Sequence, residues 1–193
     1  LDFDNFGMSF ADFQSLLERP IANMHQKGFE TEIRFVEKGA YHCYIRFPRI
    51  LFEQGLSPLE GEKILVRIDT VNREQNYHPQ VTTLNRFGIF RDILVAPAEI
   101  LLAQKLLTIV GRKREKGRDF FDVSFLAGST RPDREYLCSV FGADWQTFVK
   151  ELEERCAELD FDALAKDVEP FLQDARQAER VVRFTDLLPQ LTG

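Results

Sequence analysis

Strand-like and helix-like patterns alternate in the first part of the chain, whereas everything after Pro132 has a helical and acidic pattern. The strongest strand signal is the β-branched run at residues 63–70, which predicts a central strand. Residues 29–37 and 41–47 predict a hairpin, because a Lys-Gly turn lies between two alternating runs. This order of elements predicts an α+β core followed by an all-helical C-terminal part.

The remaining elements follow from caps and periodicity. Residues 1–6 predict a short strand, and Ser9 with Asp12 three residues later predicts a helix that ends near Gly28. We expect Pro20 to bend or split that helix. Residues 72–83 look irregular and residues 89–95 strand-like. Apolar spacing predicts further helices at 100–110, 118–126 (with Phe120, Phe121, Val123, Phe125 and Leu126 buried), 133–141, 144–159 and 161–178.

A chain of 193 residues fits one domain of ordinary size, or one domain with a helical extension, and we place the boundary between residues 1–96 and 97–193. No apolar stretch is long enough to span a bilayer. Three scattered cysteines argue against a disulfide scaffold or a zinc site, so we expect a cytoplasmic protein without a membrane partner. The sequence opens on Leu1 and not on methionine, and we expect its N-terminal piece to be missing.

Charge is distributed unevenly along the chain. The net charge is −6, and the acidic excess lies after Asp133. Residues 112–118 hold five bases and one acid, which predicts a local site for an anion. The alternative is a solvated loop between two helices.

Carboxylates on two predicted strands form the first candidate site. Asp2 and Asp4 are two residues apart on one strand, and Asp69 lies near the end of another. Carboxylates that converge from two strands supply the hard oxygen ligands that Mg²⁺ prefers. Surface carboxylates on an edge strand are the alternative.

Lys105 and the acids that follow it form the second candidate site. A lysine within an apolar helix must extend its ammonium to solvent or meet an opposite charge. Asp119 and Asp122 share a helix face, so one of them is expected to pair with Lys105; an Arg118–Asp122 pair within the helix is the alternative. The histidines share no ligand spacing, and none is predicted to be catalytic: His25, His42 and His78.

Several segments together resemble the AbiEii/AbiGii toxin family, whose members have a polymerase-beta-type core. They are LDFDNFG at 1–7, IRFP at 45–48, ILVRIDT at 64–70, ILLAQKLL at 100–107 and RKREKGRDFFD at 112–122. The resemblance covers roughly residues 1–130, and the lysine helix with the RDxxD signature is its most specific part. It implies a nucleotidyltransferase-like mixed sheet with flanking helices.

The resemblance also implies a function. Relatives bind a nucleoside triphosphate and Mg²⁺, with two ions expected, and some act as toxins of toxin–antitoxin pairs that add nucleotides to tRNA 3′ ends. It therefore implies an NTP as substrate, an RNA acceptor such as tRNA, and an antitoxin protein as partner. By position, Asp2 resembles the second acid of the metal motif and Asp69 the third carboxylate. Lys105 resembles the lysine on the triphosphate, and Asp119 the acid of the last motif.

The remaining site residues follow from the same resemblance. Asp4 fits the metal motif less well than Asp2, because Asn5 stands where an apolar residue is expected. The family's Gly-Ser/Thr phosphate turn and its first acid would precede Leu1. The predicted metal ligands are Asp2, Asp4 and Asp69; the predicted catalytic residues are Asp2, Asp69, Lys105 and Asp119; the predicted phosphate-binding residues are Arg112, Arg114 and Arg118.

Two classes of function remain open. The first is an Mg²⁺-dependent nucleotidyltransferase whose early acid, mid-chain acid, lysine and late acid gather around one pocket. The second is a catalytically degenerate relative that serves as a protein- or nucleotide-binding module, with the acidic helices docking a partner. A nuclease that uses the same acids is a third, weaker hypothesis.

Overall fold

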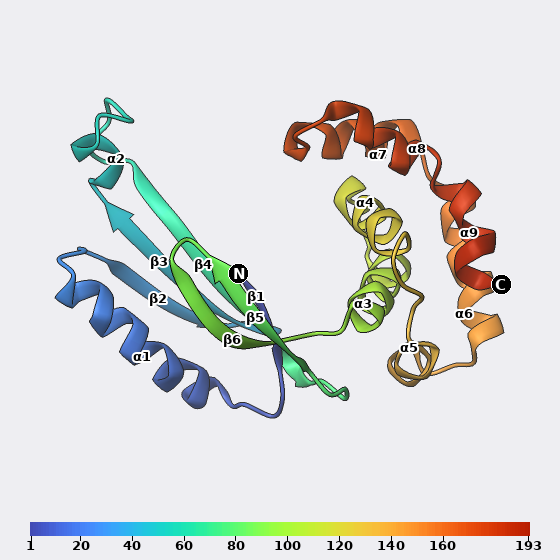
Figure 1. Ribbon diagram of the computed structural model, residues 1–193, viewed down its shortest axis with the longest axis horizontal. Helices are drawn as coiled ribbons and strands as arrows, with labels where there is room; N and C mark the ends of the chain where they lie inside the picture. Colours follow the sequence, from blue (N-terminus) through green and yellow to red (C-terminus); the bar gives the residue numbers. More distant parts are fainter. The chain divides into compact units, whose positions relative to one another are not determined.

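The computed structural model describes residues 1–71 and 75–193 with their side chains, and residues 72–74 through their strand assignment. Contacts divide the chain into two units, Leu1–Asn76 and Tyr77–Gly193, and each unit is described by itself. The first unit contains a mixed sheet and the second contains most of the helices (Figure 1). The predicted α+β class with a helical C-terminal part is confirmed.

The sheet of the first unit has the strand order β1-β4-β3-β2. Its strands are β1 (Asp2–Asn5), β2 (Glu32–Glu37), β3 (Ala40–Pro48) and β4 (Lys63–Glu74). β1 runs parallel to β4, whereas β2–β3 and β3–β4 are antiparallel, so the sheet is mixed. The β-branched run at 63–70 lies on the interior strand β4, as predicted.

One helix, α1 (Phe10–Gln26), covers one face of this sheet (Figure 1). The predicted capping box is present, because the Ser9 hydroxyl accepts from the Asp12 backbone N–H and the Asp12 carboxylate accepts from the Ser9 N–H. Pro20 lies within α1 without splitting it. Alternation along β3 turns its apolar side chains toward α1, and the core consists of Phe13, Leu17, Tyr41, Cys43 and Ile45.

The expectation of an irregular stretch over 72–83 holds for residues 75–79 and is wrong for the residues on either side. β4 extends to Glu74, and a further strand, β5 (Gln80–Arg86), pairs with β6 (Ile89–Val95). Phe87 and Gly88 connect the two strands with φ of 54° and 72°, the positive values that a tight hairpin turn requires. The contacts group this hairpin with the helices, whereas the sequence patterns placed the boundary after it, between residues 96 and 97. A short helix, α2 (Ile50–Glu53), also precedes β4.

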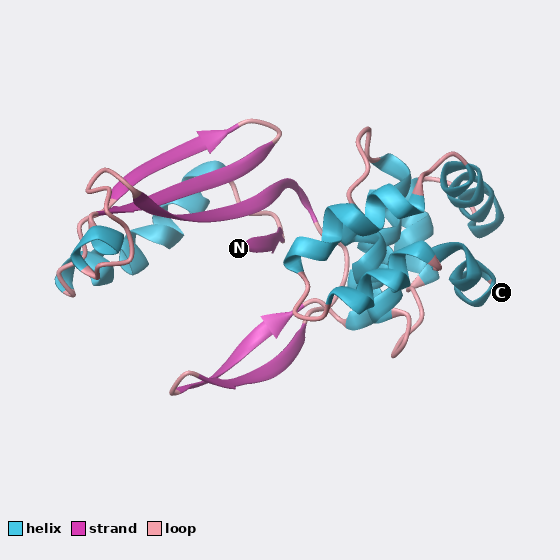
Figure 2. Cartoon of the chain, turned by 90° about the horizontal axis from the view of Figure 1, so that it is seen from above, coloured by secondary structure: helices cyan, strands magenta, loops and turns pink.

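After the β5–β6 hairpin the second unit is helical (helices are cyan in Figure 2), and its first helices are α3 (Ala98–Gly111) and α4 (Gly117–Leu126). Around them lie α5 (Arg134–Phe141), α6 (Trp145–Ala157), α7 (Phe161–Val168), α8 (Glu179–Val182) and α9 (Phe184–Thr192). The core includes Leu102, Leu106, Phe120, Phe148 and Phe184, each at most 2% exposed. Asp133 caps α5 and Asp144 caps α6, because each side chain accepts a hydrogen bond from a backbone N–H of its helix. The predicted helix start at Asp144 is confirmed.

Two helical expectations are wrong. The helix expected over 161–178 ends at Val168, because Pro170 has no N–H to continue it, and two 3₁₀ turns follow at Glu169–Phe171 and Ala175–Ala178. Phe125 was expected in the core but is 61% exposed, because α4 buries the face of Phe120 and Val123. Among the described residues, no helix combines the length and the apolar character that a bilayer-spanning segment needs.

The start of α4 touches α7 backbone to backbone. A Cβ placed on Gly117 would lie 1.9 Å from the Leu164 carbonyl oxygen and 3.3 Å from the Val168 nitrogen. The Gly117 N–H donates to Asp167 Oδ2 at 2.9 Å, so α7 caps an α4 N-terminus that has no capping side chain of its own. Only glycine therefore fits at this position.

We predict that Gly117→Ala lowers the free energy of unfolding by about 2–3 kcal/mol, because the added methyl group forces two backbones apart. Urea unfolding of the variant and the wild type measures this difference. Gly111→Ala is the matched control, since a Cβ there meets nothing within 4 Å. Equal stability of Gly117→Ala and wild type would contradict the close approach.

Candidate functional site

Three polar side chains form a row across the sheet of the first unit. Asp2 on β1 lies opposite Asp69 on β4, and Asp69 lies opposite His42 on β3. Residues directly opposite on neighbouring strands project to the same face. Since Tyr41 and Cys43 face α1, His42 and its row lie on the other face of the sheet. The structure therefore brings Asp2 and Asp69 together, as predicted.

The Asp69 carboxylate is held by two neighbours on this face. His42 Nδ1–H donates to Oδ1 at 2.6 Å, and Arg67 Nε–H donates to Oδ2 at 2.6 Å. The Asp69 side chain is only 13% exposed. Burial raises the pKa of Asp69, but the hydrogen bonds from His42 and Arg67 and the charge of Arg67 together bring that pKa below its ordinary value. Asp69 is thus a fixed, ionised carboxylate.

Asp4 has a different setting from Asp2. The β1–β4 register shifts between Phe3 and Asn5, which is where Asp4 lies. Asn5 is 2% exposed; its side-chain amide donates to the Met8 carbonyl, and its side-chain oxygen accepts from the Met8 N–H. The polar residue that departs from the family pattern therefore fastens the end of β1 to the turn before α1.

The acid pair has the chemistry of a magnesium site. Mg²⁺ is commonly held by one or two carboxylates, with water and substrate phosphates as the other ligands. Asp2 and Asp69 supply two carboxylates on one sheet face, so they fit this pattern. Outside residues 72–74, whose side chains are not described, no group of three or more His, Cys, Asp or Glu side chains is placed to hold a metal ion. The assignment of metal to Asp2, Asp4 and Asp69 stays a prediction.

A second cluster lies in the helical unit around Asp119. Lys105 Nζ on α3 is 3.3 Å from Asp119 Oδ1 and 2.6 Å from Asp122 Oδ2 on α4. Arg112 binds the other oxygen of Asp119, whose side chain is 4% exposed. Asp119 also lies in the first turn of α4, where the helix dipole favours a negative charge. The predicted pairing of Lys105 with an acid of the RDxxD segment is confirmed.

The loop between α3 and α4 is anchored from α6. Arg155 donates to the Arg112 carbonyl at 3.1 Å and to Glu115 Oε1 at 2.5 Å. The pKa of Glu115 is lowered, first by a hydrogen bond to its own backbone and further by Arg155, although desolvation acts in the opposite direction. The loop is therefore ordered by a residue 40 positions further along the chain.

The predicted phosphate-binding arginines fall into two groups. Arg112 is engaged with Asp119, whereas Arg114 and Arg118 are exposed, as are Lys113 and Lys116. The alternative Arg118–Asp122 pair is not among the ion pairs of the described side chains, and Asp122 contacts Lys105 instead. Four exposed bases thus remain on this loop and the first turn of α4.

Three contributing residues were not identified from the sequence. His42 and Arg155 reach their partners through contacts between distant segments, and no local pattern indicates such contacts. Arg67 left a usable signal, because a strand residue two positions before Asp69 projects to the same face. Burial raises the pKa of Cys43 and of Cys156 to about 11, so neither thiol is poised as a nucleophile.

The predicted residues lie in both units. Asp2, Asp4 and Asp69 belong to Leu1–Asn76, and Lys105, Asp119 and the loop arginines belong to Tyr77–Gly193. Each cluster is defined within its own unit. The expectation that the early acids, the lysine and the late acid share one pocket stays a prediction.

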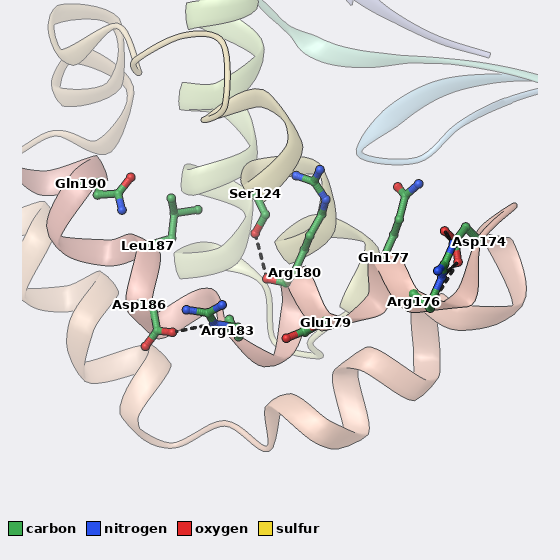
Figure 3. A pocket seen from close by; sticks show the side chains of 10 residues that line it. All are labelled: Ser124, Asp174, Arg176, Gln177, Glu179, Arg180, Arg183, Asp186, Leu187 and Gln190. Carbon is green, nitrogen blue, oxygen red and sulfur yellow. Dashed lines mark hydrogen bonds and ion pairs between the residues drawn. The ribbon is translucent and has the colours of Figure 1, made fainter.

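A groove of about 620 Å³ lies in the second unit and contains none of the predicted site residues (Figure 3). Its wall is charged, but Arg176 is paired with Asp174 and Arg183 with Asp186. Two of its lining residues are joined by a hydrogen bond, in which the Ser124 hydroxyl donates to the Arg180 carbonyl at 3.2 Å. The acids among its lining residues, Asp174, Glu179 and Asp186, make the groove a poorer anion site than the loop at 112–118.

We predict that Asp119→Asn lowers the free energy of unfolding by about 2–3 kcal/mol, because a buried carboxylate with two charged partners is lost. Asp122→Asn should cost less than about 1 kcal/mol, since that carboxylate is 39% exposed and its ion pair is partly solvated. Denaturant titration of both variants measures the contrast. Equal losses would show that Asp119 does not organise the cluster.

Comparison with known proteins identifies the family. Residues 1–190 match the family model described as "Nucleotidyl transferase AbiEii toxin, Type IV TA system". Comparison with curated proteins and with solved structures gave no match. Because the matched region covers nearly the whole chain and includes both clusters, the chain belongs to the AbiEii nucleotidyl transferase toxin family of type IV toxin–antitoxin systems.

Proposed function

We propose that this protein transfers a nucleotide from a nucleoside triphosphate to a hydroxyl of an RNA acceptor, with Mg²⁺ as cofactor. The observation that carries the proposal is the cluster of Lys105 with Asp119, Asp122 and Arg112, beside a loop with exposed bases. Family membership supports the reaction class, and the tRNA 3′ end is the acceptor that the family resemblance suggests.

The helical unit has the charge arrangement that binding a polyphosphate needs. Lys105 and Arg112 are balanced by Asp119 and Asp122, so the cluster itself is nearly neutral. The exposed bases of the loop are an additional positive charge on a protein whose net charge is −6. Such a local excess attracts a triphosphate while the rest of the surface repels it.

Lys105 is suited to stabilise the negative charge that develops on the phosphates during the reaction. Its side chain is 33% exposed, and two carboxylates fix its ammonium in place. A pre-oriented ammonium stabilises negative charge as the bond between the α-phosphate and the leaving pyrophosphate breaks. Asp119 acts here as a positioning residue, because its burial and its bond to Arg112 keep it directed at Lys105.

The acid pair of the first unit supplies the second part of the proposed chemistry. Asp2 and Asp69 would hold Mg²⁺, and His42 keeps the Asp69 carboxylate in one orientation. Bound Mg²⁺ would promote deprotonation of the acceptor hydroxyl and neutralise charge on the phosphates. In the overall reaction the acceptor oxygen forms a bond to the α-phosphorus, pyrophosphate leaves, and the hydroxyl proton passes to solvent.

An antitoxin partner follows from membership of a toxin–antitoxin family. A toxin that modifies an essential RNA must be restrained in its own cell. We propose that a protein antitoxin encoded with this chain counteracts the modification.

We predict that Lys105→Ala lowers the rate of nucleotide transfer at least about 100-fold, because one preorganised charge on the phosphates is removed. The assay follows labelled NTPs, Mg²⁺ and total RNA with full-length protein. Lys150→Ala is the control, since that exposed lysine pairs, among the side chains that the structure describes, with Glu154 alone on α6. Wild-type activity in Lys105→Ala, or no transfer by the wild type to any RNA, would count against the proposal.

We also predict that a chelator abolishes transfer, that Mg²⁺ restores it, and that Asp69→Asn is not restored. Asn keeps the size of the side chain but removes the charge that a divalent cation needs. Thermal melting with NTP and Mg²⁺ separates the alternatives, because stabilisation without transfer would indicate a nucleotide-binding module. Shortening of the RNA instead of extension would indicate a nuclease.

A further inference from the structure

Arg67 is bound to the Asp69 carboxylate, which the proposed function assigns to Mg²⁺. Its Nε lies 2.6 Å from Asp69 Oδ2 and donates a hydrogen bond to it, whereas His42 contacts the other oxygen. Its side chain is 55% exposed, in contrast to the enclosed carboxylate. A solvent-exposed cation is thus bound to an enclosed anion of the acid pair.

Arg67 interacts electrostatically with both acids. A hydrogen bond to Asp69 raises the pKa of Arg67, and the charges of Asp69 and Asp2 contribute in the same direction. Like charges directly opposite on neighbouring strands destabilise a sheet. The guanidinium therefore offsets the repulsion between Asp2 and Asp69, and β1 can stay paired with β4.

We propose that Arg67 is a resident counter-cation that a divalent cation must displace from Asp69. This inference rests on the proposed function for the metal but concerns a residue to which no role in the reaction has been assigned. Displacement requires the movement of one exposed side chain only. Asp69 keeps its orientation during the exchange, because the 2.6 Å hydrogen bond from His42 lies on its other oxygen.

The exchange sets how tightly the acid pair holds a metal. A divalent cation must break the Arg67–Asp69 ion pair and bind beside a remaining positive charge. A variant without the Arg67 charge has neither the ion pair to break nor the positive charge beside the metal, so it should bind the metal about fivefold to tenfold more tightly. In the metal-free protein, the same ion pair keeps the carboxylates from repelling each other.

Binding of Mn²⁺, followed by electron paramagnetic resonance on the full-length protein without nucleotide, tests the proposal. We expect Arg67→Gln to bind Mn²⁺ about five to ten times more tightly than the wild type, and Asp69→Asn to lose that site. Arg34→Gln is the matched control; Arg34 is exposed on the same sheet face, because Arg34 and Arg67 both lie opposite Tyr44. It forms no ion pair within the described part of the chain, and its affinity should stay within about twofold of wild type. Unchanged or weaker binding by Arg67→Gln, equal gains in both arginine variants, or binding that survives Asp69→Asn would overturn the proposal.

A second measurement needs no variant. The Nε–H resonance of Arg67 should stand apart from those of solvated arginines, because it donates a short hydrogen bond. Titration with Mg²⁺ should move it toward the solvated position, and a resonance that does not move would overturn the displacement. Metal-dependent displacement together with no nucleotide transfer would refute only the proposed function, so the two failures are distinguishable.

Discussion

The buried carboxylate of Asp119 is the constraint around which the helical unit is built. A carboxylate that is 4% exposed needs cationic partners, and it has them in Lys105 from α3 and Arg112 from the loop. Both cations are held at fixed places only if α4 starts close to its observed position. That start depends in turn on Gly117, where the backbone of α7 leaves no room for a side chain. The need of Asp119 for cationic partners thus ties together the packing of α3, α4 and α7.

The first unit meets a similar requirement by other means. Its Asp69 is held by neighbours on the same sheet, through a histidine opposite it and an arginine two residues before it. These partners come from strand register, whereas those of Asp119 come from helix packing. Each unit thus has one carboxylate of the family motifs, Asp69 or Asp119, that named partners hold in one orientation. In the proposed function the two clusters have different tasks, since one would hold a divalent cation and the other would contact phosphate.

Sequence reasoning succeeded where the signal was local. Ser9 and Asp12 predicted the start of α1, residues 63–70 predicted an interior strand, and the apolar helix around Lys105 made an opposite charge one of two possible settings for its ammonium. Each depends on neighbours within a few residues, or on the few settings that a charged group in an apolar helix can have.

The failures have equally specific reasons. β5 was overlooked because Pro79 and polar residues hide its short β-branched segment, and the helix from Phe161 was extended past Pro170 because its apolar spacing continues. His42 was set aside because its partner, Asp69, is 27 residues away on another strand. Register between strands is decided by the whole sheet, so no window of sequence contains it.

Arg155 gives the acidic C-terminal helices a part in the chemistry of the basic loop. Its guanidinium spans from α6 to the Arg112 carbonyl and the Glu115 carboxylate. The loop's conformation is therefore a joint property of two segments with opposite net charge. Sequence change at Arg155 in α6 is therefore constrained by a loop that lies far from it in the chain. A chimera that takes its C-terminal half from a relative would also replace the residue that supports this loop.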